Sequence, residues 1–372
     1  MDMGSARTPR GQAPDSEGPN SDLPNSDLPN PGLPGLDLDR LRAYLDRELP
    51  GLVRGELRGA LLPGGRSNLT YAVTDGVSRW VVRRPPLGHV LATAHDMARE
   101  HRIIAAVGRT DVPVPAALGV CTDESVNGAP FYVMGWVDGV VLDSPEKAEQ
   151  LAPERRRGAS EHLIDVLADL HAVDIDAVGL GDLAKREGYI ERQVKRWSTQ
   201  WEKSKTRELP AIDEVARLLA LRIPVQRGVS IAHGDYRFGN CLTDVAAGRV
   251  AAVLDWELCT LGDPLADVGY LGVYWYDGDG VNMRANDATP AGGFPTYADL
   301  LERYATRTGR DLSGIDYYVA FSCWRLAVIS EGVYARYLHG AMGQQEGVDL
   351  TSFKAGTEGL AERALTAMHR LT

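Results

Sequence analysis

The pattern of apolar and polar positions changes several times along the chain. Between residues 38 and 49 four leucines recur every three or four positions, and Pro50-Gly51 follows, which predicts a short helix with one buried face. Strands are then predicted over residues 57–62, 70–74 and 80–83. Asp75-Gly76 is a typical turn between the last two strands, so the region after the first helix is expected to be a β-rich layer.

A second helix and a further strand complete this layer. Residues 93–107 have helical spacing, with Thr93 as the expected cap and Glu100 as a carboxylate on the inward face. Residues 130–137 are strand-like and run into Asp138-Gly139, after which long helical patterns dominate. We therefore predict a small lobe over residues 37–138 and a larger, mostly helical lobe over residues 139–372.

Residues 1–36 are different in composition. They are rich in Pro, Gly, Asn, Ser and Asp and contain the pentapeptide Asn-Ser-Asp-Leu-Pro twice, from Asn20 and from Asn25. Such a segment has too few apolar side chains to offset the entropy lost on ordering. It is expected to be a disordered tail.

Composition excludes several classes of protein. The 40 Lys and Arg residues against 51 Asp and Glu residues give a net charge of −11, which does not suit nucleic acid as a partner. No apolar stretch is long enough for a membrane span, and no secretory signal is present. The four cysteines form no CxxC pair and are interpreted as reduced thiols. These features together favour a soluble cytoplasmic protein.

Candidate chemistry concentrates between residues 231 and 257. Two apolar stretches, residues 231–242 and 250–257, flank a turn and are expected to bring Asp235, Asn240 and Asp255 to one point. An Asp that orients an attacking hydroxyl, an Asn five residues later and a second Asp after the next strand are what phosphoryl transfer requires. The Asn and the second Asp are hard oxygen ligands suited to Mg²⁺.

These motifs resemble a known family. His233-Gly-Asp235, the Asn at 240 and Leu254-Asp-Trp-Glu257 are similar to the catalytic and metal loops of the aminoglycoside phosphotransferase and choline kinase group. Residues 62–71, 80–86, 94–100 and 131–139 resemble the kinase-like domain fused to certain acyl-CoA dehydrogenases. The resemblance covers about residues 40–370 and implies an α+β, two-lobed protein-kinase-like fold with a small β-rich N-lobe.

The resemblance also implies roles for residues of the small lobe. Gly64, Gly65, Ser67 and Asn68 correspond to the loop that covers the phosphates. Arg83 stands where kinases commonly have the lysine that holds the α- and β-phosphates, and an arginine keeps that charge in a bulkier group. Arg84 is the competing residue, but its side chain should face the other way along the strand and be exposed to solvent.

Further residues of the predicted nucleotide and catalytic sites follow from the same resemblance. Glu100 is expected to pair with Arg83, and Met134 and Trp136 lie in the hinge that would contact the adenine. His233 and Asp267 are expected to support the catalytic loop through hydrogen bonds rather than take part in the chemistry.

The function implied is transfer of the γ-phosphoryl group of ATP, with Mg²⁺, to a hydroxyl of a small molecule. Asp235 would orient and deprotonate that hydroxyl. Similarity to the domains fused with acyl-CoA dehydrogenases favours a hydroxy acid or a hydroxyacyl thioester as acceptor. An aminoglycoside or macrolide is the alternative acceptor, and a nucleotide-binding pseudokinase or regulatory module is the alternative of another class.

Overall fold

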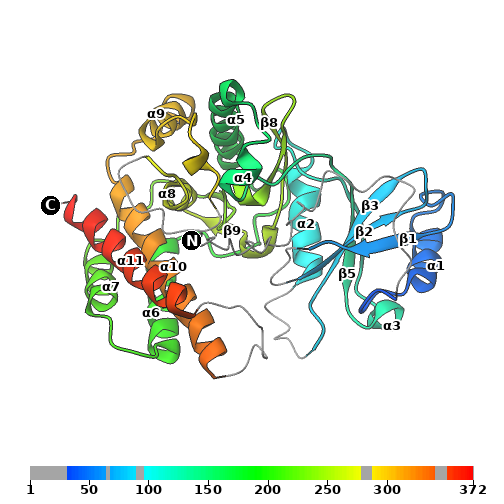
Figure 1. Cartoon of the computed structure of the whole chain (residues 1–372), viewed down its shortest axis with the longest axis horizontal. Coiled ribbons are helices and arrows are strands. Elements are labelled where there is room, and N and C mark those ends of the chain that lie inside the picture. Colours follow the sequence, from blue (N-terminus) through cyan, green and yellow to red (C-terminus); the bar gives the residue numbers. More distant parts are fainter. Residues whose placement is uncertain (1–31, 64–67, 89–95, 278–286, 340–349, 372) are drawn as a thin grey trace, which may run out of the picture.

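The computed structural model describes residues 32–63, 68–88, 96–277, 287–339 and 350–371, which form two lobes (Figure 1). The elements of the small lobe are α1 (Leu38–Glu48), β1 (Arg58–Leu61), β2 (Leu69–Thr74), β3 (Arg79–Arg84), α2 (Met97–Val107), β4 (Ala117–Cys121), α3 (Glu124–Asn127) and β5 (Phe131–Gly135). Those of the large lobe are α4 (Pro145–Ala148), α5 (Pro153–Ala172), α6 (Tyr189–Ser204), α7 (Pro210–Leu221), β6 (Ser230–Ala232), η1 (Phe238–Asn240), β7 (Cys241–Asp244), β8 (Arg249–Val253), η2 (Trp256–Leu258), β9 (Thr260–Gly262), α8 (Leu265–Val273), η3 (Thr289–Ala291), α9 (Tyr297–Thr308), α10 (Ile315–Leu338) and α11 (Leu350–His369).

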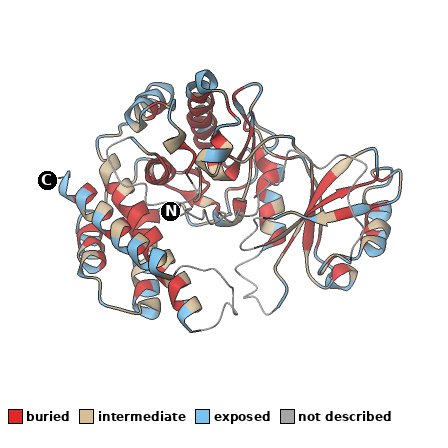
Figure 2. Ribbon diagram, viewed as in Figure 1, coloured by how far each residue is buried: buried red, intermediate tan, exposed pale blue. Residues whose placement is uncertain are grey.

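The small lobe is an antiparallel sheet with the strand order β1-β2-β3-β5-β4. Its core, which includes Tyr71, Val82 and Phe131, is fully buried between the sheet and α1. Helix α2 lies between the sheet and the large lobe, and its inward residue Glu100 is buried (Figures 1 and 2). The α+β, two-lobed fold predicted from the sequence is confirmed, and the predicted lobe boundary at residue 138 falls in the loop between β5 and α4.

The start of α2 differs from the prediction. Asp96, not Thr93, is the N-cap, because its carboxylate accepts the backbone N–H of Arg99 at 2.9 Å. Thr93 lies outside the described residues. An ionised carboxylate at this position also meets the positive end of the helix dipole, which favours Asp as the cap.

The large lobe is mainly helical, and its helices bury the sides that face one another (Figure 2). Helix α10 packs against α8 and α11 in a core that contains Phe321 and Trp324. The predicted hairpin over residues 231–257 is confirmed in part: its two arms pair around the turn at Gly248 as β7 and β8, but the residues of β6 lie outside it. β6 pairs with β9, whereas β7 pairs with β8, so the chain crosses between two small sheets. Asp235 lies in that crossing.

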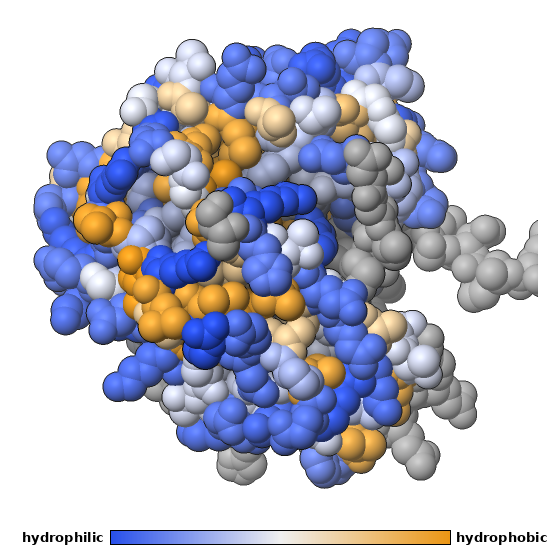
Figure 3. All heavy atoms as spheres, turned by 90° about the vertical axis from the view of Figure 1, so that its left-hand side faces the viewer, coloured by the Kyte–Doolittle hydropathy of each residue, from blue (hydrophilic) through white to orange (hydrophobic). Residues whose placement is uncertain are grey.

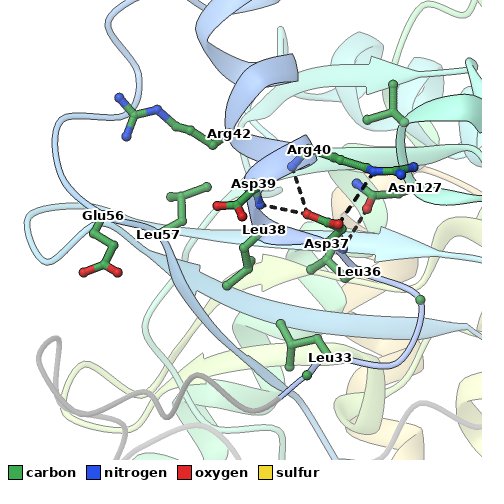
Figure 4. A pocket seen from close by; sticks show the side chains of 13 residues that line it. Leu33, Leu36, Asp37, Leu38, Asp39, Arg40, Arg42, Glu56, Leu57 and Asn127 are labelled. Carbon is green, nitrogen blue, oxygen red and sulfur yellow. Dashed lines mark hydrogen bonds and ion pairs between the residues drawn. The ribbon is translucent and has the colours of Figure 1, made fainter.

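The predicted tail extends too far into the chain. Leu36 is buried in the core of the small lobe, and the Pro34 carbonyl accepts a hydrogen bond from the Tyr71 hydroxyl. Asp37 caps α1 through the N–H groups of Asp39 and Arg40, beside a shallow pocket formed by this segment (Figure 4). Residues 33–36 therefore belong to the small lobe, because their leucines cover apolar surface that would otherwise face water.

The environment of Arg84 also differs from the prediction. It does face away from Arg83, but its side chain is buried and donates to the carbonyls of Gly35 and Asn127. The other face of the strand is covered by residues 33–36 and by α3. The expected solvent exposure of Arg84 is therefore wrong.

The face of the large lobe that points away from the small lobe carries polar side chains, with apolar side chains gathered between them (Figure 3). Leu221, Ile223 and Val225, at the end of α7 and just beyond it, are exposed large apolar residues of this lobe. Within the part of the chain that the structure describes, none of the helices has the length and apolar character needed to cross a bilayer.

Candidate active site

Asp235 and Asn240 lie together on the loop between β6 and β7. The side-chain amide of Asn240 donates to the Asp235 carboxylate oxygen Oδ2 at 2.7 Å and to the Asp235 main-chain carbonyl at 2.7 Å. The loop closes tightly because the one-turn 3₁₀ helix η1 returns the chain toward Asp235. With its amide hydrogens used in this way, the Asn240 carbonyl oxygen is directed elsewhere and can serve as a metal ligand.

The buried ring of His233 also holds this loop in place. The ring is fully buried, its Nε2 lies 2.9 Å from the Leu254 carbonyl, and its Nδ1 accepts the N–H of Asp235 at 3.2 Å. This pair of contacts requires the neutral ring with the proton on Nε2. His233 thus links the catalytic loop to the end of β8, just before Asp255.

Asp267 of α8 holds the backbone of the loop between β6 and β7. Its two carboxylate oxygens accept the N–H groups of His233 at 2.7 Å and Gly234 at 2.8 Å, and His171 lies 3.2 Å from one of them. Burial alone would raise the pKa of Asp267, but the bond and charge of His171 and the Gly234 N–H outweigh it and hold that pKa below its usual value. Gly234 has φ +84°, and a Cβ there would lie 2.9 Å from the Leu258 carbonyl oxygen.

Asp267→Asn should lower the free energy of unfolding by about 1–3 kcal/mol, because an amide has one acceptor oxygen for two buried N–H groups. Urea denaturation at pH 7 measures this cost, with Asp169→Asn as a control at a surface ion pair with Arg307. Since the folded pKa of Asp267 is lowered, the carboxylate stabilises the fold above the unfolded pKa near ~4 and loses this effect as the pH falls further. Equal midpoints at pH 7 would contradict the role of Asp267.

Arg83 of β3 lies close to three carboxylates. The Arg83 guanidinium lies 3.3 Å from Glu100, 2.5 Å from Asp255 and 3.7 Å from Glu257. The ion pair of Arg83 with Glu100 that the sequence predicts is therefore present. Glu257 belongs to the same Leu254–Glu257 motif as Asp255, but sequence reasoning gave it no role.

Glu100 is the buried member of the cluster, whereas Arg83, Asp255 and Glu257 are partly exposed. Burial raises the pKa of Glu100 to about 7, with Asp255 and Glu257 adding to this effect and Arg83 opposing it. The Tyr132 hydroxyl donates to Glu100 at 3.1 Å, and the Asn68 amide lies 3.4 Å from Glu100 and 3.2 Å from Glu257. Asn68, at the end of the predicted phosphate loop, thus reaches into the cluster.

The residues present fit Mg²⁺ bound together with a nucleotide. Within the described ranges no three His, Cys, Asp or Glu side chains form a metal cage. Mg²⁺ is commonly held by one or two protein oxygens together with phosphates and water, which needs no such cage. Asp255 and Asn240 supply that set, and one guanidinium facing three carboxylates leaves the cluster with excess negative charge.

Asp255 also has an unusual backbone. Its φ of 64° and ψ of 63° make it the one non-glycine residue with positive φ in the part of the chain that the structure describes. Aspartate tolerates this left-handed conformation better than most residues, but the conformation still has an energetic cost. Such residues often occur at functional sites, where the surrounding fold holds them in place.

Five further residues were predicted from the sequence to contact the nucleotide. Met134 is buried in β5, paired with Val81. The Trp136 indole donates to Asp138 at 2.8 Å, and Arg79 stacks on its ring at 4.8 Å. Gly64, Gly65 and Ser67 lie outside the described residues.

Three residues around Asp235 were not identified as site residues from the sequence. The Tyr270 hydroxyl donates to Asp235 Oδ1. Arg237 lies 3.7 Å from the same oxygen, and its guanidinium stacks on Tyr274 at 4.7 Å. Arg325 donates to the Gly234 carbonyl at 2.6 Å. No local sequence pattern linked α8 or α10 to this loop.

Comparisons with known proteins agree with this arrangement. A family model described as the phosphotransferase enzyme family matches residues 58–304. Acyl-CoA dehydrogenase family member 10 of Mus musculus is 35% identical over 83% of this chain and 30% of that protein. Acyl-CoA dehydrogenase family member 11 of Rattus norvegicus is 33% identical over 82% of this chain and 40% of that protein. The chain thus spans less than half the length of these relatives.

A solved structure covers nearly the whole fold. A crystal structure from Ralstonia eutropha, named as an aminoglycoside phosphotransferase, is 33% identical and superposes with a TM-score of 0.76. The match covers 90% of this chain and 98% of that one. Both lobes are therefore shared with a solved structure.

Proposed function

This chain belongs to the phosphotransferase enzyme family, and we propose that it transfers a phosphoryl group to the hydroxyl of a small hydroxy acid or hydroxyacyl thioester. In this proposal the phosphoryl donor is ATP with Mg²⁺. The observation that carries the proposal is that Asp255 lies 2.5 Å from Arg83 of the small lobe, while the residue before it, Leu254, hydrogen-bonds to Asn240, which in turn binds Asp235. We also propose that the enzyme works in the cytoplasm, where cysteine side chains such as the four buried ones of this chain stay reduced.

Asp235 is the residue that receives the acceptor hydroxyl. Its carboxylate is held at both oxygens, by Tyr270 and by Asn240, so it points in one fixed direction. A carboxylate in this state orients the hydroxyl for in-line attack and takes its proton as the bond to phosphorus forms. Most of the rate enhancement comes from this positioning, because a loose phosphoryl-transfer transition state needs little help from a strong base.

Asn240 and Asp255 would hold Mg²⁺, which supplies positive charge for the phosphate oxygens when it is bound. Arg83 would bind the phosphates from the small lobe. Glu100 anchors the Arg83 guanidinium from α2 at 3.3 Å, so the cation is held over the cleft from the side of the small lobe. An arginine can bind two phosphate oxygens at once, which offsets its bulk relative to lysine.

The acceptor class is supported by the relatives and by the charge beside Asp235. The curated relatives are named acyl-CoA dehydrogenases, whose name refers to acyl thioesters. Arg237 places a positive charge 3.7 Å from the catalytic carboxylate. A carboxylate or a thioester carbonyl next to the reacting hydroxyl would be attracted to this charge, whereas an ammonium group would be repelled.

An aminoglycoside or macrolide is the second candidate acceptor. The solved relative at 33% identity is named as an aminoglycoside phosphotransferase, and the net charge of −11 suits a polycation. A pseudokinase is the remaining alternative, supported by Arg83 in place of lysine. The retained carboxylates and Asn240 argue against that alternative.

A panel of acceptors tests the proposal. ADP release from Mg·ATP is measured with 4-hydroxypentanoyl-CoA, free 4-hydroxypentanoate, pentane-1,4-diol, kanamycin and erythromycin. We expect turnover with the thioester or the acid and little with the diol, which has a hydroxyl but lacks the acyl oxygens. Turnover confined to an antibiotic would contradict the proposed acceptor, and no turnover with any compound, despite tight ATP binding, would favour the pseudokinase.

A further inference from the structure

Tyr270, which lies outside the catalytic motif, makes contact with the central carboxylate of that motif. Tyr270 is on α8, and its hydroxyl donates to Asp235 Oδ1, while the Asn240 amide donates to Oδ2 at 2.7 Å. The ring of Tyr270 is buried, and burial together with the charge of Asp235 raises the pKa of its hydroxyl well above 10. Tyr270 therefore stays protonated and acts as a donor.

Arg325 of α10 connects the same tyrosine to the backbone of the loop. Its guanidinium lies 4.7 Å from the centre of the Tyr270 ring and donates to the Gly234 carbonyl at 2.6 Å. Arg325 is itself buried in the core between α8 and α10. Helices α8 and α10 thus hold the loop at two neighbouring points, the Gly234 carbonyl and the Asp235 carboxylate.

We propose that Tyr270, supported by Arg325, is the positioning residue that fixes the rotation of the catalytic carboxylate of Asp235. The inference rests on the proposed role of Asp235 as the residue that receives the acceptor proton. It assigns no proton transfer to Tyr270, which keeps its own proton throughout.

Fixing this rotation matters because an aspartate carboxylate turns freely about its last torsion angle. That torsion has a broad, nearly two-fold profile, so the side chain has little preference of its own. Asn240 constrains one oxygen only, and it is also a predicted metal ligand. Arg237 attracts the other oxygen from 3.7 Å, which is beyond hydrogen-bond distance, so its charge does not fix the rotation as a hydrogen bond does. Without Tyr270, Asp235 would sample orientations in which its free lone pairs point away from the acceptor, and misplacement of this kind lowers the rate of transfer more than the affinity for substrates.

Tyr270→Phe tests the proposal with the smallest change to the core. It keeps the ring over Arg325 and removes only the hydroxyl. We expect kcat to fall by on the order of 10-fold, with the Kd for Mg·ATP and the KM of the acceptor close to those of wild type. ADP release is measured with 4-hydroxypentanoyl-CoA and, separately, with water as the only acceptor, so the test does not depend on one substrate.

Tyr317→Phe is the matched control. Tyr317 is a buried tyrosine of α10 whose hydroxyl donates to the Leu219 carbonyl at 2.9 Å, away from the catalytic loop. The Tyr317→Phe protein should lose stability as Tyr270→Phe does, but its kcat should equal that of wild type. Arg325→Lys is the second variant, since it keeps the charge but loses the planar contact with the ring, and it should lower kcat in the same way.

Asp235→Asn is assayed in parallel. It distinguishes a failure of the proposed role of Asp235 from a failure of the positioning role of Tyr270. If Asp235→Asn is as active as wild type, the proposed role of Asp235 is wrong and the role of Tyr270 fails with it. If Asp235→Asn is inactive while Tyr270→Phe and Arg325→Lys keep wild-type kcat, only the positioning role is overturned. A fall in kcat that Tyr317→Phe matches would mean that lost stability accounts for the effect, which also overturns it.

Discussion

Asp235→Asn should reduce phosphoryl transfer by on the order of 10²-fold or more, the usual range for loss of a general base. The amide keeps the size of the side chain, and its one oxygen can accept either the Tyr270 hydroxyl or the Asn240 amide, but it cannot accept the acceptor proton. Binding of Mg·ATP should persist, because the metal and phosphate residues Asn240, Asp255 and Arg83 are unchanged. Steady-state rates and calorimetric titration with Mg·ATP measure the two properties.

The control for this experiment is Asp213→Asn. Asp213 is likewise hydrogen-bonded by a side chain, accepting the Trp201 indole N–H of α6 at 2.8 Å, but it lies in the first turn of α7. It should keep both turnover and ATP binding. An Asp235→Asn protein that loses nucleotide binding along with turnover would point to a damaged fold, and one that keeps wild-type turnover would remove Asp235 from the mechanism.

Asp255→Ala should make ATP binding nearly independent of Mg²⁺. The change removes a charged oxygen from the metal, and since altering residues that only support metal ligands costs 10–100-fold in affinity, we expect a loss on the order of 10²-fold. Arg83 keeps Glu100 and Glu257 as partners, so binding of metal-free ATP should change little. Calorimetric titration with ATP, with and without Mg²⁺, measures the difference.

The backbone of Asp255 requires a second variant. Alanine at φ 64° is strained, so Asp255→Ala also destabilises the loop. Asp255→Gly removes the same carboxylate without this strain and should show the same loss of metal dependence. Asp244→Asn is the control for a general disturbance of the β7–β8 hairpin, because Asp244 lies at the end of β7 and accepts the N–H of Ala247 in the turn. Undiminished metal dependence in Asp255→Gly would exclude Asp255 as a ligand.

The sequence alone determined the features that depend on local spacing. The leucine pattern after residue 38 predicts α1, and the period of residues 93–107 places Glu100 on the inward face, where it is buried. Turn residues and apolar runs predict the strands of the small lobe. The two-lobed fold and the kinase motif could be identified because motif residues such as Asp235 and Asn240 are close in the chain and keep a fixed spacing.

The tertiary structure alone decided the contacts between distant parts of the chain. Arg84 is buried by the Gly35 segment, 49 positions earlier, and Arg325 reaches the Gly234 carbonyl across 91 positions. The pairing of β6 with β9 rather than within one hairpin is likewise set by which neighbour offers free backbone groups. Periodicity shows which face of an element is apolar, but not which element covers it. The positions of Tyr270 and Arg325 beside Asp235 therefore follow from helix packing, which no local pattern records.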